Sequence, residues 1–127
     1  MNKEKKRILL IEDDAELVHA IQLRLEANHY AVLSAADGNE GLQKVHQERP
    51  DLIILDIRLP KMDGFKLCRM IKYDEEYKGI PVIILTARVQ PADIEMGKEV
   101  GADVYMTKPF KNEELLHNIE TLLTAAA

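Results

Sequence analysis

The sequence predicts an α/β fold, a doubly wound sheet of five parallel strands with helices on both faces. Segments typical of strands and of helices alternate strictly along the chain, five of each, as they do in folds built on a parallel sheet. The strand segments are short runs of aliphatic and β-branched residues, the composition of strands buried on both faces. Several of these runs stop at an acid, a threonine or a lysine.

The first half of the chain contains two strand and helix pairs. The run at 7–11 (RILLI) predicts a buried strand, and Asp14 is a suitable N-cap for the helix that follows. The run at 30–35 predicts a second strand. Residues 37–40 resemble a capping box that opens a second helix, which must end before Pro50. In the first helix, the apolar stripe at helical spacing is formed by Leu17, Val18, Ile21 and Leu25.

The central strand is predicted at 52–55 (LIIL), and it stops abruptly at Asp56. The turn residues at 63–64 precede a third helix, which ends in a polar stretch that begins at Tyr73. A fourth strand is expected at 80–85 (IPVIIL).

Pro91 suits the first turn of a fourth helix, which ends near Gly101. The run at 102–106 (ADVYM) predicts the fifth strand. The last helix begins near Asn112 and carries one apolar face, formed by Leu115, Leu116, Ile119, Leu122 and Leu123.

Composition limits the function. A chain of 127 residues with 46% apolar and 31% charged residues predicts a single soluble domain over 1–127, with about 1–6 and 124–127 as flexible ends. The net charge of -5 argues against direct binding of nucleic acid or of an anionic membrane. No apolar segment approaches the length of a membrane span, and the single cysteine excludes an internal disulfide, so we expect a cytoplasmic location.

Acidic, hydroxyl and amine side chains directly follow or end four of the predicted strands. The carboxyl ends of parallel strands lie at one edge of a doubly wound sheet. Carboxylates brought together there cannot all stay ionised without a cation, because like charges raise one another's pKa. Mg²⁺ suits such oxygen donors, and a metal, a lysine and a hydroxyl together could neutralise a phosphoryl group. The residues at these strand ends are Glu12, Asp13, Asp56, Thr86 and Lys108.

Each signal also has a simpler structural explanation. The acids at 12–14 could serve the amino end of a helix, and Asp56 could be a turn residue. Thr86 could cap a turn, and Lys108 could lie in a solvated loop. Their joint occurrence at four separate strand ends favours a shared site.

The same residues resemble those of the receiver domain of two-component response regulators, along almost the whole chain. This resemblance implies a flavodoxin-like, CheY-like (βα)5 fold with strand order 2-1-3-4-5. The motifs that carry it are Glu12-Asp13, Asp56 with Pro60 and Asp63-Gly64, Thr86-Ala87, and Lys108-Pro109.

The resemblance implies phosphorelay signal transduction rather than an enzyme with turnover. Asp56 would be phosphorylated by a sensor histidine kinase or a phosphotransfer protein, and the domain would catalyse only its own phosphotransfer and autodephosphorylation. The residues expected to hold Mg²⁺, for which Mn²⁺ could substitute, are Glu12, Asp13, Asp56 and, through its backbone carbonyl, Arg58. The residues expected to contact the phosphoryl group are Thr86, Ala87 and Lys108, and the catalytic set is Asp56, Thr86 and Lys108.

The resemblance also implies a switch. Thr86 would turn towards the phosphoryl group, Tyr105 would pack inward, and the surface of the fourth helix, fifth strand and fifth helix would change. That surface is a candidate for homodimerisation and for contact with a downstream target or a fused effector domain. Arg58 and Arg88, each two residues beyond a site residue, are expected to shape water access. Whether the bond before Pro109 is cis is left open.

Three other functions compete. An aspartyl-phosphate phosphatase normally has a second aspartate two residues after the first, where this chain has Arg58. A flavin-binding module would have its phosphate repelled by the acids at 12–14. A degenerate receiver that acts only as a protein-protein interaction module is the nearest alternative, although it has no need for Asp56, Thr86 and Lys108 together.

Overall fold

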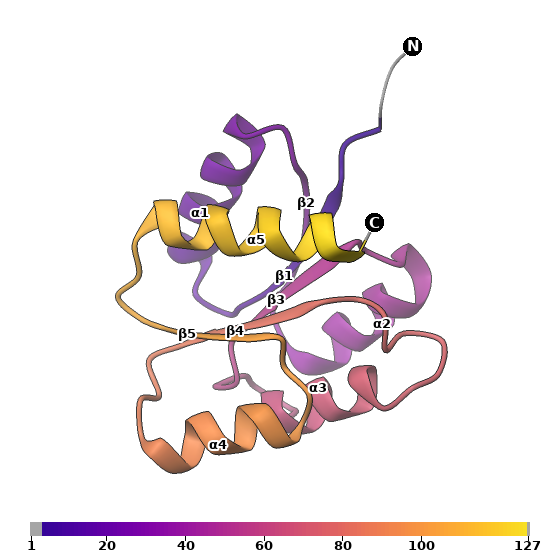
Figure 1. Cartoon of the computed structure of the whole chain (residues 1–127), viewed down its shortest axis with the longest axis vertical. Coiled ribbons are helices and arrows are strands. Elements are labelled where there is room, and N and C mark those ends of the chain that lie inside the picture. The colour runs from indigo at the N-terminus through magenta and orange to yellow at the C-terminus, as the bar shows by residue number, and fades with distance from the viewer. Residues whose placement is uncertain (1–3, 127) are drawn as a thin grey trace.

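The computed structural model describes residues 4–126 (Figure 1), and it confirms five strands and five helices in strict alternation. The strands are β1 (Arg7–Ile11), β2 (Ala31–Ala35), β3 (Leu52–Leu55), β4 (Val82–Thr86) and β5 (Val104–Thr107). The helices are α1 (Ala15–Ala27), α2 (Gly38–Glu48), α3 (Gly64–Lys72), α4 (Pro91–Glu99) and α5 (Asn112–Ala126). All strand pairs are parallel and the order is β2-β1-β3-β4-β5, as expected.

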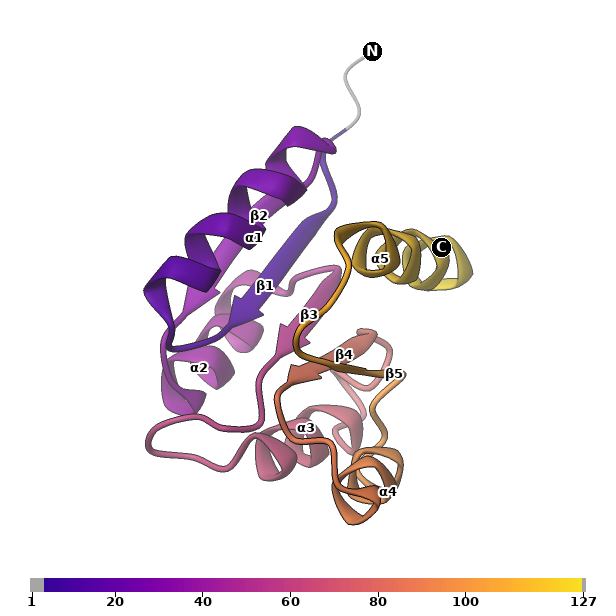
Figure 2. The same cartoon turned by 90° about the vertical axis from the view of Figure 1, so that its left-hand side faces the viewer.

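Helices cover both faces of the sheet. Figures 1 and 2 show α1 and α5 on one face and α2, α3 and α4 on the other. Each face has its own apolar core, because the side chains of a strand alternate between the two faces. β3 is the middle strand of the sheet and all four of its residues are buried. Asp56 directly follows it.

The predicted helix starts follow from capping. The Asp14 carboxylate accepts hydrogen bonds from the backbone N–H groups of Glu16 and Leu17 at the start of α1. The Asp37 carboxylate accepts one from Glu40, whose own carboxylate accepts the N–H of Ala36. These local bonds fix where each helix begins, directly after a strand of the sheet.

Two strands begin later than their apolar runs suggest, β4 at Val82 instead of 80 and β5 at Val104 instead of 102. The Val82 N–H donates to the carboxylate of Asp103 at 2.8 Å, and the Asp103 N–H donates to the Val82 carbonyl at 2.9 Å, so a side-chain bond and a backbone bond together tie the start of β4 to the segment before β5. Of the expected flexible ends, residues 1–3 and 127 lie outside the described residues, whereas 124–126 form the last turn of α5.

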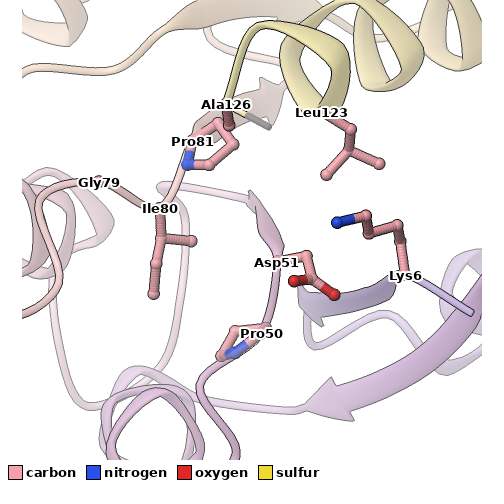
Figure 3. Close-up of a pocket in the computed structure, with 8 residues that line it drawn as sticks. All are labelled: Lys6, Pro50, Asp51, Gly79, Ile80, Pro81, Leu123 and Ala126. Carbon is pink, nitrogen blue, oxygen red and sulfur yellow. The ribbon is translucent and has the colours of Figure 1, made fainter. Parts of the chain in front are cut away.

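The edge where the strands begin, here called the amino edge, carries a cavity of about 200 Å³ (Figure 3). The Asp51 carboxylate accepts the backbone N–H of Arg7 at 2.7 Å, which ties the start of β3 to that of β1. The cavity is lined by Lys6, Pro50, Asp51, Gly79, Ile80, Pro81, Leu123 and Ala126. Within residues 4–126, no helix combines the length and the apolar character needed to cross a membrane.

Candidate functional site

The predicted site residues follow strands that stay paired up to the carboxyl edge of the sheet. The Asp56 N–H donates to the carbonyl of Ile11 at 3.0 Å, and the Lys108 N–H donates to that of Thr86 at 2.8 Å. The Glu12 N–H donates to the last residue of β2 at 3.0 Å. Because these backbone bonds fix the register, side chains that are distant in sequence start from neighbouring positions.

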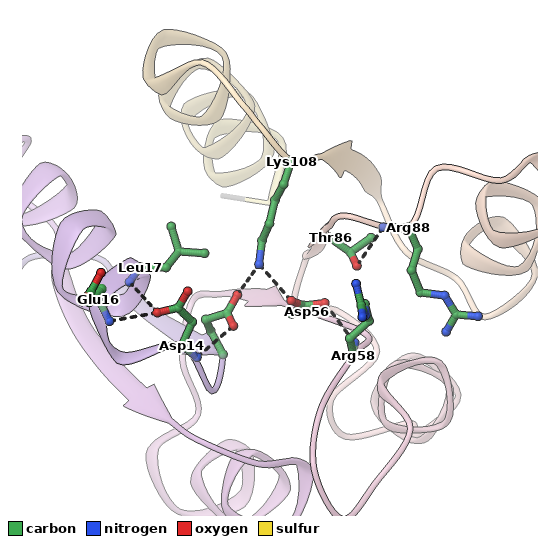
Figure 4. Close-up of polar contacts among 9 residues, drawn as sticks. Asp14, Glu16, Leu17, Asp56, Arg58, Thr86, Arg88 and Lys108 are labelled. Atoms are coloured by element: carbon green, nitrogen blue, oxygen red, sulfur yellow. Dashed lines mark hydrogen bonds and ion pairs between the residues drawn. The ribbon is translucent and has the colours of Figure 1, made fainter.

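Lys108 joins the two buried acids of this edge. Its Nζ lies 2.6 Å from Oε1 of Glu12 and 2.9 Å from Oδ2 of Asp56, and Figure 4 shows the lysine reaching to Asp56 from the end of β5. Glu12 is 5% exposed, Asp56 6% and Thr86 0%, and no other polar or charged residue of the described chain is equally buried. The structure therefore brings together Glu12, Asp56, Thr86 and Lys108, as the strand ends predict.

Burial and ion pairing act on the charges in opposite directions. Burial raises the pKa of Glu12, although the hydrogen bond from Lys108 and that from the Asp14 N–H both lower it. For Lys108, burial lowers the pKa, but the hydrogen bonds to Glu12 and Asp56 outweigh it, so the pKa is raised. The amine therefore stays charged, and it is the cation that keeps the two carboxylates together.

The remaining oxygens of the two acids bond to the backbone. Oε2 of Glu12 accepts the N–H of Asp14 at 3.1 Å, and Oδ1 of Asp56 accepts the N–H of Arg58 at 2.9 Å. Beyond Arg58, the loop returns at Gly64, whose N–H donates to the carbonyl of Ile57 at 3.1 Å. Each carboxylate is thus held by the segment that follows its strand as well as by Lys108.

Asp13 lies next to Glu12 but is exposed. Both acids line a cleft of about 240 Å³ between α1 and the end of β2. Over residues 4–126, no three histidine, cysteine or acidic side chains are gathered in a group that could hold a metal ion. Lys108 lies between the acids instead, so the structure brings two of the predicted carboxylates together and leaves Asp13 beside them.

The donor set nevertheless fits Mg²⁺. Its donors are carboxylate oxygens, the hard ligands that Mg²⁺ prefers. The buried pair of Glu12 and Asp56 already holds one cation, the Lys108 ammonium, which shows that this edge needs positive charge.

Thr86 ends β4 at the same edge. Its Oγ1 accepts the N–H of Arg88 at a long 3.4 Å, so the hydroxyl is held only weakly (Figure 4). Ala87, the next residue, is exposed and carries only a methyl group. Arg58 is exposed too, and its role through the backbone carbonyl stays a prediction.

Tyr105 is half-buried on β5, and its hydroxyl donates to the carbonyl of Arg88 at 2.7 Å. Burial raises the pKa of this phenol. The predicted switch pair, Thr86 and Tyr105, therefore shares one neighbour, Arg88. The Lys108–Pro109 peptide bond is cis.

Some features of the site have no signal in the sequence. The guanidinium of Arg88 forms an ion pair with Asp93 at 3.1 Å and lies over the ring of Phe65. Gly97 adjoins the Tyr105 ring. These contacts join α3, α4 and β5, and only the folded arrangement of those elements brings them together.

A parallel sheet of this order, with acids, a threonine and a lysine at its carboxyl edge, defines a doubly wound, flavodoxin-like fold. A family model described as the response regulator receiver domain matches residues 8–120. The chain belongs to this family of two-component response regulator receiver domains.

Curated relatives agree. The chain is 40% identical over 118 residues to the alkaline phosphatase synthesis transcriptional regulatory protein PhoP of Bacillus subtilis, covering 93% of this chain and 48% of the relative. It is 44% identical over 117 residues to the DNA-binding dual master transcriptional regulator RpaA of Synechocystis, covering 92% and 48%. The chain thus spans about half the length of these relatives.

Solved structures are similar as well. A CheY-like response regulator receiver domain protein from Methanospirillum hungatei has a TM-score of 0.91 and 31% identity, covering 96% of both chains. The receiver domain of the sensor histidine kinase PA1611 from Pseudomonas aeruginosa has a TM-score of 0.87 and 32% identity, covering 94% of this chain and 98% of that one. That structure is described with a magnesium ion coordinated in its active site cleft.

Proposed function

We propose that the chain is a phosphorylatable receiver that accepts a phosphoryl group on Asp56 from a phosphohistidine of a sensor histidine kinase or a phosphotransfer protein. The observation that carries this proposal is the pairing of two buried carboxylates, Glu12 and Asp56, around the amine of Lys108 at the carboxyl edge. Family membership implies a histidine kinase partner.

In the transfer, a carboxylate oxygen of Asp56 bonds to phosphorus while the bond from phosphorus to the histidine nitrogen breaks, and the nitrogen keeps the electron pair. Asp56 needs no base because it reacts as the carboxylate. The ammonium of Lys108, bonded to Asp56 at 2.9 Å, and the hydroxyl of Thr86 would stabilise negative charge on the phosphoryl oxygens.

Glu12, Asp13, Asp56 and the carbonyl of Arg58 would hold Mg²⁺ here. When bound, the ion supplies positive charge for the phosphoryl oxygens and for the acids. The magnesium ion described in the cleft of the PA1611 receiver supports this assignment. Mn²⁺ has similar oxygen preferences and is expected to substitute.

The switch follows from the same residues. A phosphoryl group would draw the hydroxyl of Thr86 away from its long bond to Arg88, Tyr105 would adjust, and the surface of α4, β5 and α5 would change. That surface is our candidate for homodimerisation and for the output contact. Because the relatives named PhoP and RpaA are described as transcriptional regulators, a fused DNA-binding effector is the output that we favour for the whole protein.

The test is phosphorylation by acetyl phosphate, or by a cognate histidine kinase, with Mg²⁺ present and intact mass as the readout. We expect the wild type to gain one phosphoryl group and Asp56→Asn to gain none. A gain in both proteins contradicts Asp56 as the acceptor. No gain in the wild type under either donor contradicts the proposal and favours a degenerate receiver that only binds other proteins.

A further inference from the structure

The ring of Tyr105 lies directly against α4 at Gly97. A Cβ atom added to Gly97 would stand 2.7 Å from Cδ2 and 3.1 Å from Cε2 of this ring. Carbon atoms in real proteins do not approach so closely without displacement. The next neighbour, Cδ1 of Ile84, would be 3.6 Å away, which is an ordinary contact. Tyr105 alone therefore occupies the space that a side chain at position 97 would need.

The backbone does not require glycine at this position. Gly97 lies inside α4, and its backbone is not in the left-handed region, unlike that of Gly101. Glycine is a poor helix former, and alanine would favour α4 in the absence of other effects. The physical reason for a glycine at this site is the packing of the Tyr105 ring.

The other end of Tyr105 is held by the loop between β4 and α4. Its hydroxyl donates to the carbonyl of Arg88 at 2.7 Å. The Arg88 side chain is anchored to Asp93 of α4 at 3.1 Å, and its guanidinium lies 5.8 Å from the ring centre of Phe65 on α3. The N–H of the same Arg88 donates to Oγ1 of Thr86 at 3.4 Å. One residue therefore connects the hydroxyl at the site with the hydroxyl of Tyr105.

We propose that Gly97 is a positioning residue of the switch: its missing side chain forms a slot on α4 that sets the Tyr105 ring where its hydroxyl bonds to the Arg88 loop. This inference rests on the proposed function, because the loop bond matters to signalling only if Thr86 responds to a phosphoryl group at Asp56. We predict that a side chain at position 97 displaces the Tyr105 ring, so that the position of the ring no longer depends on whether Asp56 is phosphorylated.

The first test is Gly97→Ala, observed by NMR with ¹³C-labelled tyrosine, the Tyr105 signal being assigned from its loss in Tyr105→Phe. Burial raises the pKa of the Tyr105 phenol in the wild type. We expect the alanine methyl to push the ring towards solvent, which moves that pKa back towards its ordinary value. Gly79→Ala is the matched control, because a Cβ there meets nothing within 4 Å, and it should leave Tyr105 unchanged.

A folded Gly97→Ala protein with the Tyr105 shifts and titration of the wild type overturns the proposal. Should Gly97→Ala fold poorly, urea unfolding decides the matter with Tyr105→Ala, which removes the contacting ring atoms, and the double variant. If the clash is with the ring, Gly97→Ala lowers the unfolding midpoint only while Tyr105 is present, and raises it in the Tyr105→Ala background. A lowered midpoint in both backgrounds overturns the proposal.

The second test adds acetyl phosphate and Mg²⁺. Gly97→Ala should still gain one phosphoryl group, since the added Cβ meets Tyr105 and Ile84 rather than Asp56, Thr86 or Lys108. The change in the Tyr105 signal that accompanies phosphorylation of the wild type should be lost. An unaltered change of signal overturns the proposal. If the wild type is not phosphorylated but Tyr105 is displaced in Gly97→Ala, the proposed function is contradicted, whereas the conclusion that Gly97 positions the Tyr105 ring stands.

Discussion

The two edges of the sheet use the same residue types in different ways. At the amino edge, Asp51 is partly exposed and bonds to the backbone of Arg7, while Lys6 is exposed. At the carboxyl edge, Asp56 is buried and shares the amine of Lys108 with a second buried acid. Both edges are formed by the same parallel strands, so the presence of acids and lysines at strand termini does not by itself explain why only those of the carboxyl edge are buried together.

The difference in burial and partners suggests that the acid of the amino edge stabilises the fold, whereas the two acids of the carboxyl edge need another explanation. An acid that accepts a backbone N–H near solvent helps to fix a strand and needs no further partner. Burying two carboxylates costs solvation energy that ion pairing only partly returns, so stability gives little reason for such a cluster. We therefore attribute the residues of the carboxyl edge to the proposed phosphoryl transfer rather than to the stability of the fold.

The largest expected contrast is in phosphorylation. Asp56→Asn should abolish the gain of a phosphoryl group from acetyl phosphate with Mg²⁺, whereas Asp51→Asn should leave it unchanged, because the asparagine oxygen can still accept the Arg7 N–H. Intact mass of both variants and the wild type checks this. Loss of phosphorylation in Asp51→Asn would mean that the amino edge also serves the reaction.

A glycine on each side tests how tightly each edge is packed. A Cβ at Gly64 would lie 2.3 Å from Cα of Ile57 and 2.8 Å from the carbonyl oxygen of Asp56, both backbone atoms. Gly64→Ala should lower the free energy of unfolding by about 1–3 kcal/mol. Gly79→Ala, at the amino-edge cavity, should change it by less than about 0.5 kcal/mol. Urea unfolding measures both, and equal effects would show that the edges are packed alike.

The two lysines test the charge difference. Lys108→Met leaves Glu12 and Asp56 without their cation and should lower the free energy of unfolding by about 1 kcal/mol near neutral pH without Mg²⁺. Burial already raises the pKa of Glu12. As the pH falls, the folded Lys108→Met protein therefore binds protons before its unfolded chain does. The loss of unfolding free energy relative to the wild type should shrink as the pH falls through the raised pKa of Glu12, and it should grow as the pH rises.

Urea unfolding of Lys108→Met at several pH values checks this expectation, and Lys6→Met is the control. Lys6 is exposed, so its replacement should cost less than about 0.5 kcal/mol at every pH. A loss in Lys108→Met that is the same at all pH values would show that the lysine contributes packing rather than charge.

The smallest expected effect is on metal affinity. If Glu12 holds Mg²⁺ as proposed, the metal needs its ionised form, and because the pKa of Glu12 is raised, binding measured by calorimetry should weaken as the pH falls towards the range in which Glu12 takes up a proton. In Glu12→Gln, binding should be weaker overall and this pH dependence should diminish. An affinity that is constant over the range would remove Glu12 from the metal site.

The fold and the strand ends could be predicted from the sequence because both depend on local signals. Buried strands appear in the sequence as short apolar runs. The capping residues Asp14 and 37–40 indicate where α1 and α2 begin. Parallel strands in strict alternation with helices then require that Glu12, Asp56, Thr86 and Lys108 share an edge. That convergence depends on topology and not on side-chain detail.

The remaining features depend on side-chain packing across long sequence separations. Nothing local indicates that Lys108 bonds both acids, or that the Asp103 side chain accepts the N–H of Val82 where β4 begins. The contacts of Arg88 with Asp93 and of Gly97 with the Tyr105 ring likewise require α4 to be in place. Each of these contacts results from tertiary packing, which no periodicity in the sequence encodes.

Helix α5 spans the distance between the two edges. It begins four residues after Lys108 and ends at Ala126, which lines the amino-edge cavity together with Leu123. Its 15 residues form a rod of about 22 Å that packs on the sheet through Leu115 and Ile119. If phosphorylation at the carboxyl edge displaces the first turn of α5, we expect Leu123 and Ala126 at its other end to shift as well, which would change the shape of the amino-edge cavity.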